Sequence, residues 1–271
     1  MSTLDRVFNS DIDARPVRFV RIVIGIMSLL RAVEGWRIGS RVLDPATLKT
    51  PIIAGLTVPA GILIPLVAAW MLSAVFFTFG LRTRLSGAVL ATCMFLMLLL
   101  DQQLYSNHLY LLSIEVLLLS LTGIGRRSKT VPAWPVVLLK LQLSIVYLFA
   151  AITKLTPLFL SGAVLYLNLK RDGLFALPPS MRTLPVLSVL SVAAVLTEIF
   201  LGFGLWSLKY RRSAVVVGIA FHITLTVMIV PVVAVQLFIF SVAVLTLYPL
   251  YFYPMLPSGE VSYLRPIAGR D

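Results

Sequence analysis

The sequence predicts an all-α integral membrane protein, a polytopic helical bundle with about eight transmembrane segments. Of its 271 residues, 59% are hydrophobic and only 13% are charged, and the mean hydropathy is +0.98. Soluble globular domains contain about 45–50% apolar and about 25% charged residues. Because a membrane-spanning helix takes about 20 apolar residues, we expect residues 1–271 to form a single transmembrane domain with short cytoplasmic tails.

Apolar runs between proline, glycine and basic clusters mark the candidate spans. These runs are residues 17–36, 60–80, 85–104, 108–122, 136–155, 186–207, 214–230 and 232–253. The connection 37–59 contains Pro51 and Pro59 and an apolar stretch that is too short to span. We expect this connection to lie at the membrane interface.

The basic residues predict the orientation, because Lys and Arg accumulate on the cytoplasmic side of a membrane. With a cytoplasmic N-terminus, 13 of the 23 Lys and Arg fall on that side, six fall on the other, and Arg21, Arg31, Lys140 and Lys154 fall within spans. The net charge of +12 is therefore mostly a topology signal. We expect both termini in the cytoplasm and the protein in a bacterial inner membrane. Basic residues dispersed over short loops argue against a nucleic-acid partner.

The counts of metal-binding and redox residues are low. Cys93 is the only cysteine, which excludes an intrachain disulfide and a CxxC pair. His108 and His222 are the only histidines, and no HExxH, phosphate-loop or EF-hand pattern is present. We expect no metal site, so any redox chemistry would use a bound molecule.

Ionisable residues inside the apolar runs are the candidate functional residues. A charge at the bilayer centre costs about 2.5–3.5 kcal/mol on insertion scales, so such residues usually face the bundle interior or a water-filled cavity. In the expected topology, five of them share the outer half of the membrane and three lie deeper. The outer residues are Arg31, Glu34, Asp101, His108 and Lys154, and the deeper ones are Glu115, Glu198 and His222. The pattern predicts a polar cavity that opens outward.

The run 136–155 carries a polar stripe. Lys140, Tyr147 and Lys154 are spaced by seven residues, with Ser144 between them. A helix returns to nearly the same face every seven residues. The stripe therefore ends in a lysine at the outer side, although both lysines are also consistent with side chains that extend to the two membrane interfaces.

The other polar residues have structural interpretations as well. Arg31 and Glu34, three residues apart, most simply form an internal ion pair. Glu198 is also satisfied by Arg31 or by a backbone group, and His222 by a hydrogen bond to a neighbouring helix. Asn107 is placed to cap the helix that follows it.

Several of these residues lie in segments that resemble a known family. The segment QLSIVYLFAAITKL, Gln142 to Leu155, with Ser161 and Gly162 after it, resembles the core segment of the vitamin K-dependent gamma-carboxylases and their shorter bacterial relatives, the horizontally transferred transmembrane (HTTM) domain proteins. Asn107-His108 and Phe221-His222 resemble the two histidine elements of that family, in the same order. The resemblance runs from about residue 15 to 253 and is that of a short, bacterial-type member without the lumenal domain.

The resemblance implies a lysine-initiated reaction. Lys154 matches the lysine that acts as general base toward vitamin K hydroquinone. In the family the quinol anion reacts with O2, the resulting strong base removes a proton from a glutamate side chain, and CO2 adds to the carbanion. The implied cofactor is vitamin K hydroquinone or menaquinol, with O2 and CO2 as co-substrates. Asn107, His108 and His222 are implied to bind or orient the quinone oxygens, and Tyr147 joins them from the polar stripe.

Two departures shape the functional prediction. Thr153 precedes Lys154 where the carboxylases commonly carry a second lysine, and no large lumenal domain follows Pro254. We therefore expect O2-dependent quinol epoxidation or oxidation by a membrane-embedded enzyme, coupled to carboxylation of a small-molecule or peptide substrate. The alternative is a non-enzymatic membrane protein, such as a small-molecule transporter or a toxin-immunity or signalling partner, that binds a ligand in the same cavity.

Overall fold

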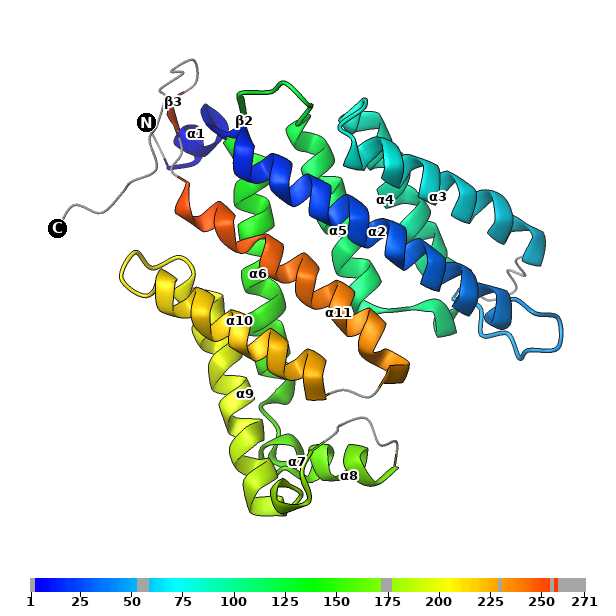
Figure 1. The fold of residues 1–271 in the computed structure, drawn as a ribbon, viewed down its shortest axis with the longest axis vertical. Coiled ribbons are helices and arrows are strands. Elements are labelled where there is room, and N and C mark those ends of the chain that lie inside the picture. The colour runs from blue at the N-terminus through cyan, green and yellow to red at the C-terminus, as the bar shows by residue number, and fades with distance from the viewer. Residues whose placement is uncertain (1–2, 53–58, 172–176, 229–230, 254–255, 258–271) are drawn as a thin grey trace.

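Helices make up almost all of the fold in the computed structural model, which describes residues 3–52, 59–171, 177–228, 231–253 and 256–257 (Figure 1). The long helices are α2 (Ala14–Val42), α3 (Leu63–Thr78), α4 (Thr83–Leu100), α5 (Asn107–Thr122), α6 (Ala133–Lys154), α9 (Leu184–Gly204), α10 (Arg211–Met228) and α11 (Pro231–Thr246). The short helices are α1 (Thr3–Phe8), α7 (Pro157–Leu160) and α8 (Ala163–Arg171), and the 3-10 turns are η1 (Ala60–Ile62), η2 (Gln102–Leu104), η3 (Pro179–Met181) and η4 (Tyr248–Phe252).

The all-α prediction is confirmed, and each of the eight predicted ranges coincides with one long helix. Among the described residues, four segments are long and apolar enough to cross a membrane, namely Thr83–Leu100, Ala133–Lys154, Leu184–Gly204 and Val235–Phe252. Helices α3 and α5 are apolar but shorter. The count of eight spans therefore stays a prediction.

The expected interfacial connection 37–59 is partly wrong. Helix α2 continues to Val42, so the first part of this stretch is helical rather than a loop. A 3-10 turn, η1, forms at Ala60–Ile62 and leads into α3. Part of the predicted interfacial segment, residues 53–58, lies outside the described residues.

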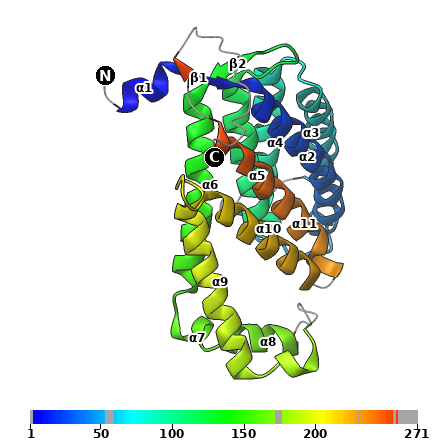
Figure 2. The same cartoon turned by 60° about the vertical axis from the view of Figure 1, so that its left-hand side comes forward.

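The long helices pack mostly on their neighbours in the chain. Helices α2, α3, α4 and α5 pack in sequence, α5 contacts α6, and α6 packs along α9. Helix α11 closes the arrangement, because it contacts α10 and returns against α2 and α5 (Figure 1). Seen from the side, α6 and α9 form a column that extends beyond the other helices and ends at α7 and α8 (Figure 2).

A small antiparallel sheet lies at the end of the bundle where α2 and α6 begin. Its strands are β1 (Ser10–Asp13), β2 (Thr130–Pro132) and β3 (Leu256–Pro257), in the order β2-β1-β3. Asp11 pairs with Pro132 on one side and with Leu256 on the other. No sequence pattern predicted this sheet, which connects three distant points of the chain.

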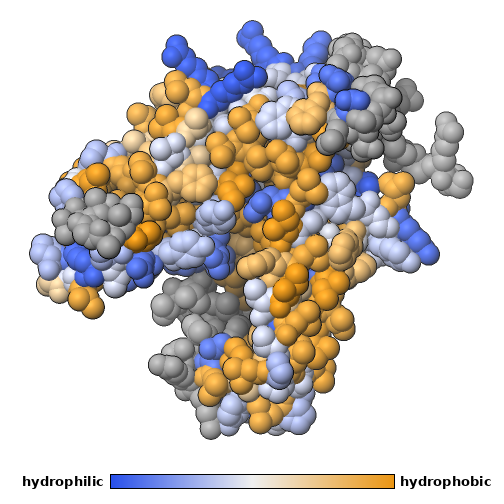
Figure 3. Space-filling view, turned by 180° about the vertical axis from the view of Figure 1, so that it is seen from behind, coloured by the Kyte–Doolittle hydropathy of each residue, from blue (hydrophilic) through white to orange (hydrophobic). Residues whose placement is uncertain are grey.

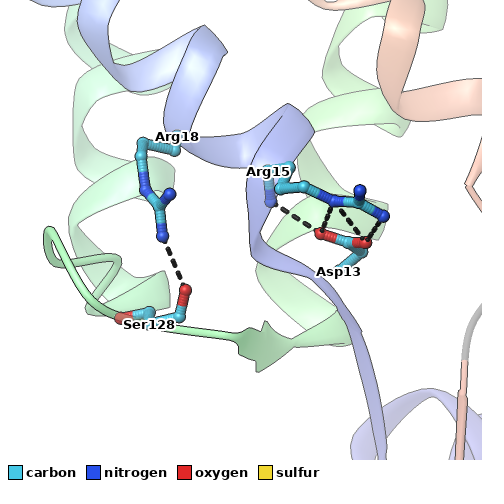
Figure 4. A network of polar contacts seen from close by, with 4 residues as sticks. All are labelled: Asp13, Arg15, Arg18 and Ser128. Carbon is cyan, nitrogen blue, oxygen red and sulfur yellow. Dashed lines mark hydrogen bonds and ion pairs between the residues drawn. The ribbon is translucent and has the colours of Figure 1, made fainter. Parts of the chain in front are cut away.

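Asp13 ends β1 and caps α2. Its carboxylate accepts hydrogen bonds from the backbone N–H of Arg15 at 2.8 Å and from the Arg15 guanidinium at 2.6 and 2.9 Å (Figure 4). Burial raises the pKa of Asp13, but these hydrogen bonds and the charge of Arg15 outweigh it, so the pKa lies below its ordinary value. The same end of α2 carries Arg18, which donates to the Ser128 carbonyl at 2.6 Å.

Arg21 fixes the C-terminal end of α3. Its side chain is only 2% exposed, and its guanidinium donates to the carbonyls of Phe77 and Thr78, the latter at 2.7 Å. Unpaired carbonyls at a helix C-terminus carry partial negative charge that a cation stabilises. Gly80 follows with φ +71°, and a Cβ there would lie 3.0 Å from the guanidinium nitrogens of Arg21.

Asp101 directly follows α4 and connects the end of that helix to Thr50, in the segment between α2 and η1. It accepts hydrogen bonds from the backbone and hydroxyl of Thr50 at 2.8 and 2.6 Å and from the backbone of Gln103 at 2.9 Å. Burial of the carboxyl raises its pKa, but the hydrogen bonds from Thr50 and Gln103 outweigh this and lower the pKa below the ordinary value. Asp101, which the sequence placed among the outer polar residues, is thus a structural cap.

We predict that Gly80→Ala destabilises the fold. The left-handed backbone costs a non-glycine residue about 1–2 kcal/mol, and the new methyl group would press on the Arg21 guanidinium. The midpoint of thermal unfolding in detergent should fall, whereas Gly61→Ala, whose Cβ would meet no atom within 4 Å, should leave the midpoint nearly unchanged. Equal midpoints for Gly80→Ala and the wild type would contradict the prediction.

We also predict that Asp101 makes stability sensitive to acid. Because its folded-state pKa lies below the ordinary value of 3.8, the stabilisation is complete above that value and is lost as the pH falls through the folded-state pKa. Between about pH 5 and pH 3, the unfolding midpoint of the wild type should therefore drop more steeply than that of Asp101→Asn. The control Asp44→Asn, at an exposed carboxylate before Thr50, should follow the wild type, and identical acid profiles for all three proteins would exclude this role.

Candidate functional site

The polar stripe of α6 faces the interior of the bundle. Ser144 and Tyr147 are buried, and Lys140 is only 8% exposed. Lys154, the last residue of the helix, has a side chain that is 31% exposed. The seven-residue spacing identified one face of α6, and in the structure Lys140, Ser144 and Tyr147 of that face are buried.

Lys154 forms an ion pair with Glu198 of α9. The Nζ atom of Lys154 donates to Oε1 of Glu198, whose side chain is buried. The second carboxylate oxygen, Oε2, is buried and has no hydrogen-bond partner in the described part of the chain. The Lys154 ammonium therefore does more than extend to the interface, and one acceptor beside it is left open.

The ion pair of Glu198 with Lys154 decides between the predicted partners of the buried charges. The predicted alternative in which Glu198 pairs with Arg31 is wrong. Arg31 instead pairs with Glu34 at 3.1 Å, as the three-residue spacing suggested, and both side chains are buried.

Tyr147 lies at the centre of a buried hydrogen-bond cluster. Its hydroxyl is 2.9 Å from Nε2 of His222 and 2.6 Å from the hydroxyl of Tyr248. The other imidazole nitrogen, Nδ1 of His222, is 3.2 Å from Oγ of Ser241. Four elements, α6, α10, α11 and η4, therefore meet at one hydroxyl–imidazole cluster, and both ring nitrogens of His222 are engaged.

Gly218 allows this cluster to form. It lies one turn before His222 on α10, and a Cβ at this position would collide with the Tyr248 ring and hydroxyl. The absence of a side chain therefore lets η4 approach the α10 backbone closely enough for Tyr248 to reach Tyr147.

His108 approaches the same region from α5 but is separated from it by an aromatic ring. The Phe240 ring lies 4.6 Å from the His108 ring and 5.8 Å from the His222 ring, measured between centroids. The structure thus brings His108, His222 and Tyr147 into one neighbourhood, with Phe240 between the two imidazoles.

The prediction that Asn107 caps the helix that follows it is wrong. Asn107 is the first residue of α5, and the cap is Ser106, whose hydroxyl accepts from the backbone of Leu109 at 3.4 Å. The Asn107 side chain is exposed. No hydrogen bond of the Asn107 side chain is found among the described residues.

The prediction that the Lys140 side chain extends to the cytoplasmic interface is also wrong. The Nζ atom of Lys140 lies 5.5 Å from the centroid of the Tyr251 ring, and the Tyr251 hydroxyl donates to the Lys140 carbonyl at 2.8 Å. Beside them, the indole N–H of Trp206 donates to Oγ of Ser144 at 2.7 Å. This end of the stripe is closed by aromatic side chains.

The surface of the molecule is hollowed on the side where the column projects. Figure 3 shows the hollow between the projecting lobe, which α7, α8 and the lower end of α9 form, and the remainder of the bundle. Lys154 lies at the junction of α6 with this lobe. A separate apolar groove of about 480 Å³ lies along the upper part of α9; it is lined by Leu196, Ile199, Phe200, Phe203, Gly204, Ser207 and Tyr210, and contains none of the predicted site residues.

The sequence missed the residues that complete the cluster. Ser241 and Phe240 lie in the middle of the apolar run 232–253, and Tyr248 and Tyr251 lie near its end, where tyrosines usually indicate an interfacial belt. Glu115 is fully buried, and neither of its carboxylate oxygens has a partner within the described chain. Among the described residues no group of three or more His, Cys, Asp or Glu could hold a metal ion.

We predict that Tyr147→Phe destabilises the bundle. The substitution keeps the ring but leaves His222 Nε2 and the Tyr248 hydroxyl without their shared partner, and a buried unsatisfied polar group costs about 1–3 kcal/mol. Thermal unfolding in detergent should show a lower midpoint. Tyr110→Phe, at an exposed tyrosine of α5, is the control and should unfold like the wild type; a midpoint for Tyr147→Phe within error of that control would show that the cluster contributes little.

The comparisons with known proteins agree with this architecture. The HTTM domain family matches residues 9–255, a range that includes every long helix and all of the predicted site residues. No curated protein and no solved structure matches the chain. With its apolar helices and this match over most of its length, the chain belongs to the HTTM domain family and is an integral membrane protein.

Proposed function

We propose that the protein binds a reduced quinone at the site around Lys154 and that Lys154 is the general base that takes the quinol proton. The observation that supports this proposal is the ion pair between Lys154 and Glu198, with Oε2 of Glu198 buried and unpartnered. A buried acceptor without a partner is costly, so a ligand hydroxyl that donates to it would be favoured.

The ion pair explains how Lys154 acts as a base. A general base must be neutral to accept a proton, and burial in a low-dielectric environment makes separated charges costly. When the proton between Nζ and Oε1 passes to Glu198, both groups are neutral and the Lys154 amine can accept. The Lys154 side chain is partly exposed, so a ligand can reach it.

Tyr147 offers a second contact for the ligand. A phenolic hydroxyl has one donor hydrogen and two acceptor lone pairs, and two of these three are used by His222 and Tyr248. We propose that a quinol hydroxyl takes the remaining position. Since both nitrogens of His222 are engaged within the protein, we propose that His222 positions Tyr147 and does not itself bind the quinone oxygen.

His108 and Asn107 are proposed to border the ring of the ligand. His108 stacks near Phe240, and this aromatic pair offers an apolar wall beside the polar groups. A bound vitamin K hydroquinone or menaquinol would supply the O2-dependent chemistry, including epoxidation, that no side chain here can supply. With CO2 as co-substrate, a small-molecule or peptide substrate would be carboxylated at the same opening.

The proposed setting is a bacterial inner membrane with both termini in the cytoplasm. It is supported by the excess of basic residues on the side of the sheet, where Figure 3 shows hydrophilic side chains projecting from the bundle. Lys154 would then lie toward the outer side. Residues 1–271 are proposed to act as one domain.

A second function, ligand binding without chemistry, is favoured by one observation. The Lys154 ammonium, the Tyr147 hydroxyl and the His222 imidazole each have a partner within the protein. A transporter or a toxin-immunity or signalling partner could use the same site for recognition alone.

We predict that Lys154→Ala abolishes quinol turnover. Loss of a general base typically lowers the rate about 10²- to 10⁴-fold, and consumption of O2 by the purified protein with reduced vitamin K or menaquinol would measure it. Glu198→Gln, which keeps the shape but cannot take the proton, should also be strongly impaired. Lys129→Ala, at an exposed lysine beside the sheet, should retain wild-type turnover.

Binding measurements separate the two functions. If the wild type binds the quinol but consumes no O2, and Lys154→Ala weakens that binding, the non-enzymatic function holds. A Lys154→Ala protein that folds and turns over quinol like the wild type would end the general-base proposal.

A further inference from the structure

Three arginines meet at the end of the bundle that carries the sheet. Arg18 and Arg21 lie three residues apart on α2, which places them on the same face of the helix. Arg126 comes from the connection between α5 and β2. Arg21 donates to the carbonyls of Phe77 and Thr78, and Arg126 donates to the next carbonyl, that of Phe79, at 2.7 Å.

Backbone carbonyls hold each guanidinium in place. Arg18 donates to the carbonyl of Ser128, two residues after Arg126. Each arginine thus uses only part of its hydrogen-bonding capacity, since a guanidinium has five N–H donors. Nε of Arg18 and Nε of Arg21 are buried and have no partner in the described part of the chain.

No carboxylate pairs with these three arginines among the described residues. Asp13 interacts electrostatically with Arg18, but its carboxylate is engaged by Arg15, whose side chain is directed away from that of Arg18 (Figure 4). The cluster therefore holds three positive charges that the protein itself does not neutralise. Capping of α3 accounts for Arg21 and Arg126 in part, but it does not account for Arg18 or for the unpartnered Nε atoms.

Large apolar side chains border the cluster on its exposed side. Phe19, next to Arg18, is 51% exposed, and Phe79, whose carbonyl binds Arg126, is 56% exposed. Leu81, which follows Gly80, is exposed as well. Cationic groups beside exposed apolar ones match a molecule that is anionic at one end and apolar at the other.

We propose that Arg18, Arg21 and Arg126 form a binding site for the phosphate of an anionic phospholipid in the leaflet on the sheet side. Guanidinium groups bind phosphate oxygens in bidentate geometry, and basic pockets between transmembrane helices recognise anionic head groups. The phosphate neutralises the cluster, and the acyl chains lie along Phe19 and Phe79.

Lipid competition on the full-length protein tests the site. The protein is transferred into detergent micelles that contain equal amounts of phosphatidylglycerol and phosphatidylcholine, and the bound lipids are counted by mass spectrometry of the intact protein. The wild type should retain phosphatidylglycerol preferentially. A basic residue at the surface contributes about 1 kcal/mol, or about fivefold in affinity, so Arg18→Gln with Arg126→Gln should weaken phosphatidylglycerol binding roughly tenfold or more.

Two further variants keep the result interpretable. Arg212→Gln removes the same charge from an exposed arginine at the start of α10 and should change the affinity less than about twofold. Arg18→Lys with Arg126→Lys keeps the charge but loses the bidentate geometry of the guanidinium groups, so it should weaken phosphatidylglycerol binding less than the Gln pair does. Circular dichroism and a single peak in size-exclusion chromatography establish that each variant is folded.

Three outcomes would overturn the site. They are the absence of a phosphatidylglycerol preference in the wild type, an equal loss in Arg212→Gln and in the Gln pair, and an equal loss in the Lys pair and the Gln pair. Inorganic phosphate that displaces the lipid at comparable concentration would overturn the lipid assignment. None of these measurements involves Lys154, so the site stands or falls apart from the quinol chemistry.

Discussion

The polar face of α6 imposes the central constraint on this fold. A helix inside a bilayer satisfies its own backbone, but its polar side chains find no water and must be satisfied by other helices. Here the polar groups of the stripe that ends in Lys154 are satisfied by Glu198 of α9, His222 of α10 and Tyr248 of η4, and by Trp206, which follows α9. The positions of α9, α10 and η4 around α6 follow from that requirement as much as from apolar packing.

The polar groups of the stripe differ in how completely their hydrogen bonds are made, and this difference determines where the site can bind a ligand. At one end aromatic side chains enclose Lys140, and in the middle Tyr147, His222 and Tyr248 complete one another. At the other end the pair between Lys154 and Glu198 is partly exposed and leaves an acceptor open. The HTTM family match extends over all of these groups, and the chemistry proposed for the site rests on the end of the stripe that is incomplete.

The helices were predictable because they depend on local sequence, whereas the pairings were not. Apolar runs located all eight long helices, and a spacing of seven placed Lys140, Tyr147 and Lys154 on one face of α6. The partner of Lys154 is 44 residues away, and only packing decides that it is Glu198 and that Arg31 turns to Glu34 instead. The sheet was not predicted because its strands have two to four residues, too few for a periodic pattern. The cap of α5 was predicted one residue too late, at Asn107 instead of Ser106.

The sheet has a mechanical consequence. It ties the segment before α2, the segment before α6 and the chain after η4 into one hydrogen-bonded unit, so the ends of α2, α6 and η4 cannot separate there without breaking strands. Within the described residues, no sheet ties the helices together at the opposite end of the bundle. The projecting lobe of α7 and α8 is attached at that end through α6 and α9. The sheet therefore restrains one end of the bundle. Any widening that admits a lipid-sized molecule occurs at the opposite end, where Lys154 lies.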